Sequence, residues 1–496
     1  MTKAAAIADT RVHPGTIAIR YVKDLPQTLI GLPAVFALMS DTGWSYIVPI
    51  ALTAALVLGL TQWLAWSRFR YGLGASELLI ESGLLSRNRR SIPFERIQDL
   101  DIEQGPLHRL FGLAKVKVET GAGGKDEGVL DSVTLAEADR LRRVIRAGQG
   151  RAEAAVEAAA EPSDRVVFTM RPRRVFVSGL FNFSLIWVAG LFGLLQTFEP
   201  LIPFDVRDPG RWLGLVESGQ ERFTAGAIAA VLLVALGLGV ITGILRTLSR
   251  DWNFRLSAEG KRLRRTRGLF TRTEAVIPKR RVQLALLRTG PLRQAVGVGE
   301  LFVQTLGSSK GQGGLQSVAP FARSPEIDRV VEELPGLRLP GDAPLARVST
   351  RSLVRSAIQS LTGPTIAIAA TATQRPEALA FLPILPVLLA GAVLRRRFHR
   401  YGRSGELLFV QAGWWRRQLW AVPIANVQSA SISRSLLQRW LGLATLALDT
   451  AGAPTFGGPR IVDIRVETAR TLRDDILDGQ RSRATASASR AGAAKS

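Results

Sequence analysis

The sequence predicts a membrane protein of the α+β class, in which six transmembrane helices in three hairpins alternate with three antiparallel β modules, each capped by a C-terminal helix. Three observations support this prediction: a segment that occurs three times, a pair of apolar stretches ahead of each copy, and arginine concentrated at one end of those stretches. The chain of 496 residues combines a net charge of +24 with 47% hydrophobic residues. Apolar membrane segments alternating with basic segments near a lipid surface account for both values.

The repeated segment aligns without gaps at residues 83–120, 268–305 and 413–450. Five glycine, proline, glutamine or threonine positions are identical in all three copies, which indicates one module used three times. The copies are too far apart in the chain for a solenoid, so each is expected to form a domain of its own. The five positions are Gly83, Gly268 and Gly413; Pro93, Pro278 and Pro423; Gln98, Gln283 and Gln428; Gly112, Gly297 and Gly442; and Thr120, Thr305 and Thr450.

Within each copy, the residue pattern indicates β-structure. In the first copy, Ala114, Val116 and Val118 alternate with polar residues, as in a half-buried strand. The first glycine of each copy follows a short apolar strand and is expected to supply a hairpin turn with positive φ. Helix-like segments close the modules at residues 135–145, 326–334 and 466–477.

Two apolar stretches precede each copy of the module. Each stretch of the second pair is long enough to cross about 30 Å of hydrocarbon at about 1.5 Å per residue. The third pair is weaker and contains Pro364, but its place before a module predicts a hairpin by analogy. The expected division is an N-terminus (1–24), hairpin 1 (25–66), module 1 (67–147), a linker (148–174), hairpin 2 (175–248), module 2 (249–337), a linker (338–352), hairpin 3 (353–394), module 3 (395–480) and a disordered tail (481–496).

Lysine and arginine near the helix ends predict the orientation. The short loops inside the hairpins hold few basic residues, whereas the opposite ends of the helices hold many. By the positive-inside rule, both termini and all three modules are expected to face the cytoplasm.

The arrangement resembles the bacterial PH-like domain of the YdbT-type membrane proteins, over residues 11 to about 478. The resemblance implies a pleckstrin-homology-like (PH-like) fold, with two packed antiparallel sheets and a C-terminal helix. It also implies a multi-pass protein of the bacterial inner or plasma membrane, an envelope role such as stress or defence, no enzymatic activity, and often a shorter membrane partner of the same family. The residues that carry it are Ile92–Pro93, Ile97–Gln98, Pro106–Leu107 and Gly112–Leu113; Ile277–Pro278, Val282–Gln283, Pro291–Leu292 and Gly297–Val298; and Val422–Pro423, Val427–Gln428 and Gly442–Leu443, where Leu436 replaces the proline.

Basic residues, most of them in the second module, are the main candidates for a contact with anionic lipid or a partner. Residues 262–305 hold ten basic and two acidic residues, against seven of each in 77–120 and four and one in 407–450. A basic patch tethered beside a membrane gains about 1 kcal/mol per residue held near anionic lipid. A solvated surface with general positive-inside bias explains the same residues equally well. The candidates are Arg87, Arg264, Arg265, Arg267, Arg272, Lys279, Arg280, Arg281 and Arg417, of which Arg87, Arg272 and Arg417 occupy one repeated position.

Other repeated or clustered residues are better explained by the fold. The amides of Gln98, Gln283 and Gln428 are expected to satisfy backbone groups of an adjacent turn. Trp414, Trp415 and Trp420 suit sheet packing more than insertion into lipid.

No catalytic, metal or cofactor site is predicted. The chain has no cysteine and three histidines far apart in sequence. The glycine-rich segments 121–128 and 307–314 lack the phosphate-loop pattern, and no hydrolase or metalloprotease motif occurs. Nucleic-acid binding is disfavoured, because the charge is spread over three modules without a recognition helix.

Two functions from different classes remain. The favoured one is a non-catalytic membrane scaffold whose modules bind anionic lipid, each other as a homo-oligomer, or a shorter relative. The alternative is a transport or channel component whose modules assemble or gate the membrane part. The predicted spans carry no ionisable residue at their centres, and this favours the scaffold.

Overall fold

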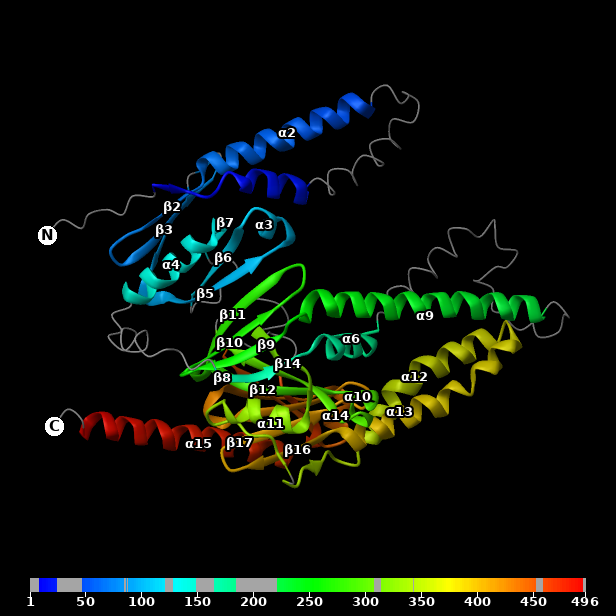
Figure 1. Cartoon of the computed structure of the whole chain (residues 1–496). Helices are drawn as coiled ribbons and strands as arrows, with labels where there is room; N and C mark the ends of the chain where they lie inside the picture. Colours follow the sequence, from blue (N-terminus) through cyan, green and yellow to red (C-terminus); the bar gives the residue numbers. More distant parts are fainter. Residues whose placement is uncertain are drawn as a thin grey trace. The chain divides into compact units, whose positions relative to one another are not determined.

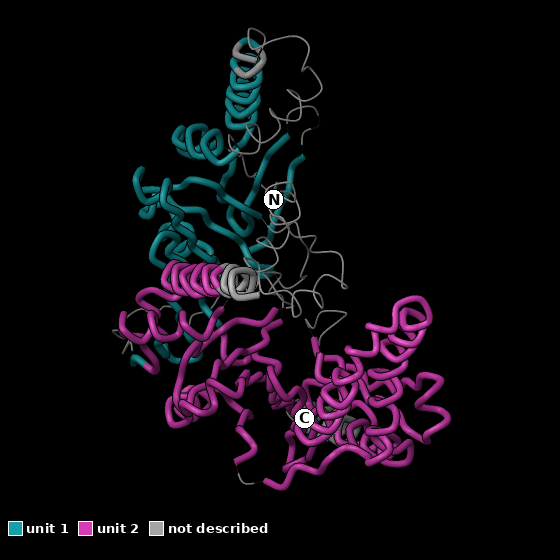
Figure 2. Tube along the Cα trace, turned by 90° about the vertical axis from the view of Figure 1, so that its right-hand side faces the viewer, with its two compact units in different colours: residues 1–166, 257–277, 307–309 teal, residues 167–256, 278–306, 310–496 magenta. Residues whose placement is uncertain are grey.

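The computed structural model describes residues 9–24, 47–83, 86, 88–120, 128–148, 165–183, 221–306, 314–341, 343–451 and 458–493. The chain divides into two compact units (Figure 2). One unit comprises residues 1–166, 257–277 and 307–309, and the other comprises residues 167–256, 278–306 and 310–496.

Each repeated module has the same element order, so the predicted β modules are confirmed (Figure 1). Three strands are followed by a 3-10 turn, a long strand, a short helix, two more strands and a closing helix. Module 1 has β2 (Arg70–Leu73), β3 (Glu77–Ser82), β4 (Asn88–Pro93), η2 (Phe94–Arg96), β5 (Ile97–Gln104), α3 (Pro106–Leu110), β6 (Leu113–Thr120), β7 (Val129–Thr134) and α4 (Leu135–Gly148). Module 2 has β9 (Arg255–Glu259), β10 (Arg262–Arg267), β11 (Arg272–Pro278), η4 (Lys279–Arg281), β12 (Val282–Thr289), α10 (Pro291–Ala295), β13 (Val298–Thr305), β14 (Leu315–Arg323) and α11 (Ser324–Glu332). Module 3 has β16 (Arg400–Ser404), β17 (Leu407–Ala412), β18 (Arg417–Pro423), η7 (Ile424–Asn426), β19 (Val427–Ser433), α14 (Leu436–Trp440), β20 (Leu443–Thr450), β21 (Arg460–Arg465) and α15 (Val466–Ala493).

The invariant glycines lie where the backbone requires them. Gly83, Gly268 and Gly413 have φ of 120°, 112° and 85°, which confirms the predicted positive-φ turns. The invariant prolines end β4, β11 and β18, each directly before the 3-10 turn. The identical glycines and prolines of the repeat therefore occupy positions where the turns require them.

A short strand in front of each hairpin also belongs to a sheet, which the sequence did not reveal. β1 (Thr10–Arg11) pairs with β2, β8 (Arg165–Thr169) neighbours β9, and β15 (Ala346–Arg347) pairs with β16. β8 and β15 lie inside the segments 148–174 and 338–352, which were expected to be linkers. Each hairpin is thus an insertion between two neighbouring strands, rather than a segment that simply precedes the module.

Two of the sheets are shared between consecutive modules. The strand order β7-β6-β5-β11-β10-β9-β8 places β5 of module 1 beside β11 of module 2. The order β14-β13-β12-β18-β17-β16-β15 places β12 of module 2 beside β18 of module 3. The remaining sheets are β1-β2-β3-β4 and β19-β20-β21. Consecutive modules are therefore joined by main-chain hydrogen bonds.

Each unit has its own apolar core. In the first, residues from β3, β5, β6, β7 and α4 pack together, including Leu78, Leu100, Val116, Leu130 and Leu141. In the second, a cluster joins β12 and β13 with the strands of module 3 and α15, including Leu286, Val410, Val422, Leu446 and Ile476. The closing helix therefore packs on the sheets in modules 1 and 3.

Helices of 9 to 31 residues occupy the described parts of the predicted hairpins. They are α2 (Ile47–Arg68), α6 (Pro172–Leu180), α9 (Glu221–Asp251), α12 (Ser352–Ala372) and α13 (Ile384–Phe398). Among the described residues, two stretches are long and apolar enough to cross a membrane, Leu233–Asp251 in α9 and Pro376–Phe398, which includes η6 (Pro376–Phe381) and α13. The expected count of six is therefore not reached; residues 25–46 and 184–220, where parts of three predicted stretches fall, lie outside the described residues.

The helices of the second hairpin pack closely through glycine. A Cβ atom at Gly179 of α6 would lie 2.7 Å from the Cα of Ile244 in α9, and one at Gly243 would lie 2.5 Å from the carbonyl oxygen of Asn182. Asn182 also donates a hydrogen bond of 3.0 Å to Thr247. Small residues and a polar side-chain bond are typical of contacts between membrane helices.

The C-terminal end differs from the expectation. Residues 481–496 were expected to be disordered, but α15 continues to Ala493. Alanine is the best helix former and arginine is close to it, so the composition of this stretch sustains a helix that packing alone would not require.

Candidate functional site

The arginines of β10 are largely occupied by contacts within the fold. Arg264 lies between two carboxylates, at 3.3 Å from Glu259 and 3.0 Å from Glu274. Burial lowers the pKa of its guanidinium, but the two carboxylates outweigh burial and leave the pKa raised. Arg265 is only 7% exposed, on the same face as the buried Leu263, and Arg267 is half-buried. These three residues do not form an open basic surface.

The remaining candidates are spread over separate positions. Lys279 pairs with Glu333 at 2.6 Å, and Arg281 is half-buried. Arg272 and Arg280 are exposed. Arg417 donates to Gln294 and its guanidinium lies 3.9 Å from the centroid of the Phe398 ring. Arg87 lies outside the described residues.

The glutamines and tryptophans divide between structural and exposed positions. Gln283 is buried and its amide donates to the carbonyl oxygen of Arg281 at 3.2 Å, as predicted for a residue that satisfies a turn. Gln428 is exposed, and the side chain of Gln98 lies outside the described residues. Trp420 is in the core, whereas Trp414 and Trp415 are 37% and 57% exposed.

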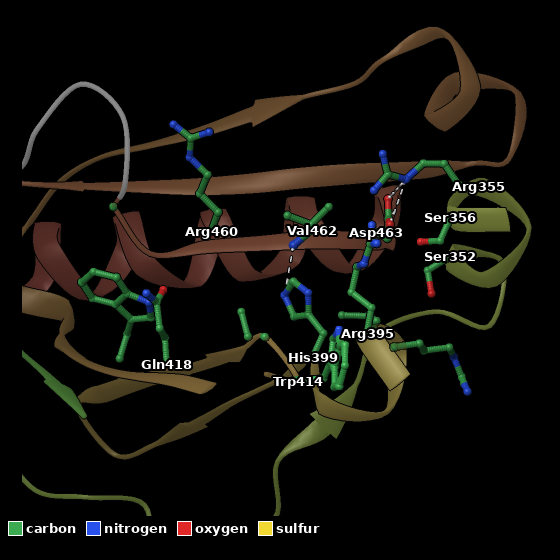
Figure 3. A pocket seen from close by; sticks show the side chains of 16 residues that line it. Ser352, Arg355, Ser356, Arg395, His399, Trp414, Gln418, Arg460, Val462 and Asp463 are labelled. Carbon is green, nitrogen blue, oxygen red and sulfur yellow. Dashed lines mark hydrogen bonds and ion pairs between the residues drawn. The ribbon is translucent and has the colours of Figure 1, made fainter. Parts of the chain in front are cut away.

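The basic residues that gather around a cavity belong to the third module, where the helical hairpin joins the sheets (Figure 3). The cavity encloses about 400 Å³. Its walls come from the first turns of α12, the last turn of α13, the turn after β17, and strands β18 and β21. The charged and polar residues among its lining are Ser352, Arg355, Ser356, Arg395, Arg396, His399, Gln418, Arg460 and Asp463.

An ion pair forms one wall of this cavity. The Nε atom of Arg355 lies 2.7 Å from Asp463, whose side chain is 6% exposed. Gln438 also donates to Asp463 at 2.9 Å. Asp463 is therefore neutralised, and the other three arginines, of which Arg395 and Arg460 are exposed, leave the cavity with an excess of positive charge.

His399 adds no charge to the cavity at neutral pH. Burial lowers the pKa of its imidazole below 6.5, although the nearby Asp463 acts in the opposite direction. Its Nε2 atom accepts a hydrogen bond of 3.4 Å from the backbone of Val462, drawn in Figure 3. The neutral ring therefore holds β21 against the end of α13.

Ser352 provides an unusual feature of the cavity wall. It is 3% exposed, and its hydroxyl has no hydrogen-bond partner among the described residues. A buried hydroxyl without a partner costs about 1–3 kcal/mol, so such groups are rare unless a ligand or water satisfies them. Ser352 begins α12, whose N-terminus carries a partial positive charge. A hydroxyl, a helix N-terminus and arginines together suit an anion.

The other two modules have an ion pair at the equivalent junction, formed by different residues. In module 1, Arg20 lies 3.1 Å from Asp131, which also contacts His108 at 3.1 Å. In module 2, Arg174 makes a two-pronged ion pair with Glu326. Each arginine follows the strand that precedes a hairpin. The sequence does not predict these pairs, because each joins residues more than a hundred positions apart. The only sequence signal for them is an arginine near the start of each predicted hairpin.

A metal centre is not evident among the described residues, where no cluster of three or more histidine or acidic side chains could hold an ion.

Comparison with known proteins matches this chain to one family three times. The family model described as "Bacterial PH domain" matches residues 27–149, 191–337 and 356–480. The "UPF0699 transmembrane protein YdbT" of Bacillus subtilis is 24% identical over 345 residues, covering 65% of this chain and 68% of that protein. The "UPF0699 transmembrane protein YdbS" of the same organism is 36% identical over 77 residues, covering 16% of this chain and 46% of that protein. No solved structure matches.

The matched segments agree with the structure, since each contains one module together with part of the predicted hairpin before it. The transmembrane names of the relatives and the two apolar helices indicate a transmembrane protein, and no catalytic activity is indicated. This chain belongs to the bacterial PH domain family and carries the family's unit three times.

Proposed function

We propose that this protein is a non-catalytic membrane scaffold that holds three PH-like modules at the inner face of the bacterial membrane and contacts anionic lipid through the cavity of the third module. The observation that carries the proposal is the position of that cavity. It lies where the apolar helix α13 ends in Arg395 and Arg396. Residues at the end of a membrane helix lie at the level of the lipid headgroups.

The cavity chemistry supports a phosphate-bearing headgroup. Arginine binds phosphate through several N–H donors, and serine hydroxyls at a helix N-terminus are common companions. Arg395 and Arg460 are exposed lining residues, and the hydroxyl of Ser352 is buried without a partner among the described residues. Trp414, which also lines the cavity, is of a type enriched at the lipid interface.

The proposal includes six spans and a cytoplasmic orientation. The three strands β1, β8 and β15 each precede a hairpin and lie in the same sheet as the strand that follows it. Both ends of each hairpin must then be on one side of the membrane, because the two strands are neighbours. An even number of crossings per hairpin satisfies this condition, and the arginine-rich ends favour the cytoplasmic side.

The test uses the full-length protein reconstituted in nanodiscs with graded fractions of phosphatidylglycerol in phosphatidylcholine. Native mass spectrometry then counts the retained anionic lipids. The variant Arg395→Gln/Arg460→Gln is expected to lose affinity by about 10- to 30-fold, because each charge near anionic lipid contributes about 1 kcal/mol.

The matched control is Arg403→Gln/Arg470→Gln. These residues are also exposed arginines of the third module, but they do not line the cavity. The control is expected to bind like the unaltered protein. Equal losses in both variants would show a general charge effect and would contradict a lipid site in this cavity.

A further inference from the structure

Two strands, one in the first module and one in the third, lie at a sheet edge, although the equivalent strands of the other modules are paired with a neighbouring module. β4 ends the first sheet and β19 ends the last, and no described strand lies beyond either one. The equivalent strands β11 and β18, and β5 and β12, are all covered by a strand of the adjacent module. Among the described strands, β4 of module 1 and β19 of module 3 therefore leave uncovered the two edges that are paired at the internal joints.

The two internal joints have the same register. At the first joint, Arg272 pairs with Gln104 and Thr273 with Glu103. At the second, Arg417 pairs with Thr289 and Gln418 with Arg288. In the gapless alignment of the repeats, these are the same positions. A register that recurs between modules of different sequence is a property of the family's fold, because shifting it by one residue would move every side chain to the opposite face.

Burial shows what the joint does to a strand. Ala285 and Leu286 of β12 are 1% and 0% exposed at the second joint. Their counterparts in β19 are the half-buried Ala430 and the exposed Ser431. Likewise Val276 of β11 is 6% exposed, whereas its counterpart Ser91 in β4 is exposed. The open edges therefore have the more polar and exposed residues of uncovered strands, although β4 and β19 are each only one residue shorter than their covered counterparts.

We propose that β4 of one copy of this chain pairs with β19 of a second copy, in the register of the two internal joints. Such a contact joins two different surfaces, so it repeats from copy to copy and builds an array or a closed ring. The internal register places Asn88 opposite Ser433, Arg90 opposite Ser431 and Ser91 opposite Ala430. A second copy is the favoured occupant because one chain carries both halves of the joint.

Charge opposes the pairing at one end of the register, where Arg87 holds the position of Arg272 and Arg417, and Arg434 holds that of Gln104 and Thr289. Elsewhere along the proposed register, the arginines of β4 face serine or isoleucine rather than a basic residue. At the first internal joint, Arg142 of α4 reaches Glu274 of β11 at 3.0 Å. The corresponding outer positions are Arg473 and Arg89, and each has a carboxylate of its own, Asp474 and Glu81. Main-chain bonds, as in other strand additions, therefore supply the contact. The proposal stands apart from the anion site, which uses other residues.

The absence of native cysteine makes cross-linking a direct test. Two differently tagged full-length copies are expressed together, one with Asn88→Cys and the other with Ser433→Cys, and oxidised in the membrane. Opposed residues in an antiparallel pair have Cβ atoms about 4.5–5.5 Å apart, close enough for a disulfide after small adjustment. The expected result is a disulfide-linked species that carries both tags.

Two control pairs of cysteines provide yields for comparison. Asn88→Cys with Ser431→Cys, two residues out of register on the same face, is expected to give at least five-fold less product. Thr273→Cys with Glu103→Cys in one chain is the internal equivalent of the same pair and is expected to cross-link within the molecule.

Equal yields from the in-register and offset pairs would overturn the proposal. So would capture of a different protein by Asn88→Cys in place of the tagged copy, which would assign the edge to a shorter relative. Failure of the internal pair would remove the register from which the outer joint is inferred, and would equally overturn it.

Discussion

In the first and third modules, an ion pair joins the start of the predicted hairpin to the last strand, but the aspartates come from different repeat positions. In both, an arginine after the pre-hairpin strand binds an aspartate near the last strand, as Arg20 binds Asp131 and Arg355 binds Asp463. When the closing helices are aligned, Asp463 corresponds to Ser132 rather than to Asp131. Both Ser132 and Asp463 have φ of 64°, so the same bulge presents a carboxylate from either of two adjacent positions. The backbone feature is shared and the charged residue is not.

The third partner also differs. Asp131 contacts His108, whereas Asp463 accepts a hydrogen bond from Gln438, and these two partners occupy the same repeated position. The side chain of Asp131 is 17% exposed and that of Asp463 is 6% exposed. The third junction is therefore drier, and its ion pair has more to lose when one partner is removed.

The largest expected effect on stability comes from removing the arginine of the ion pair in the first or the third module. Arg355→Leu leaves Asp463 buried without its cation and should destabilise the protein by about 3–5 kcal/mol. Arg20→Leu should cost on the order of 1–2 kcal/mol, because Asp131 keeps His108 and some water. Thermal unfolding of the detergent-purified full chain, followed by tryptophan fluorescence, measures both.

The double variant Arg355→Leu/Asp463→Asn provides the control for that prediction. Removing the charge together with its partner should restore most of the lost stability. Equal losses for Arg20→Leu and Arg355→Leu would contradict the difference between the junctions.

A feature that the modules share should respond equally in each. An added Cβ at Gly83, Gly268 or Gly413 would overlap the carbonyl oxygen three residues later, of Ser86, Thr271 or Arg416. Alanine at any one of them should cost about 1–3 kcal/mol, since the positive φ is also strained for a side chain. Gly391→Ala, where the space is open, is the control and should be close to neutral. A cost confined to one module would show that the turn is not equivalent in all three.

The smallest expected effect is a difference between the first and third modules in how their stability depends on pH. Burial holds the pKa of His399 below 6.5, so the folded third module binds its proton less readily than the unfolded chain. Stability should be full above pH 6.5 and fall as the pH drops below that value. Burial raises the pKa of Asp131, but His108 and Arg20 outweigh it and leave the pKa below 3.8, so the first module should lose that contribution only in stronger acid.

The melting temperature measured as a function of pH checks this order. His399→Gln should flatten the decline between about pH 6.5 and 5 and leave the behaviour in stronger acid unchanged. An unaltered decline in that variant would show that another group is responsible.

Turn chemistry and strand alternation made most of the module predictable from sequence. A glycine with positive φ and a proline before a 3-10 turn leave local signatures, and these recur at fixed spacing. Alternation along β10 also contained the burial of Arg265, because it lies two residues from Leu263 and so on the same face. The net charge of the segment does not show this burial, because it does not distinguish the two faces of a strand.

The pairing of strands between modules and the cavity could not be predicted from the sequence. Strand pairing between modules depends on main-chain groups that every sequence carries, and β1 and β15 are two residues long, too short for any pattern. The cavity gathers residues from α12, α13, β18 and β21, which are distant in the chain. Only tertiary structure brings them together.

The strands that precede the hairpins set an order of events during synthesis. β1 leaves the ribosome before any of residues 12–69, yet its partner β2 comes after them. If the segment between them crosses the membrane as proposed, the first sheet can close only when both ends of that segment lie on the same side of the membrane. A segment that crossed the membrane an odd number of times would leave the two strands on opposite sides of the membrane. Under the proposed topology, strand pairing in each module therefore requires an even number of membrane crossings between the two paired strands.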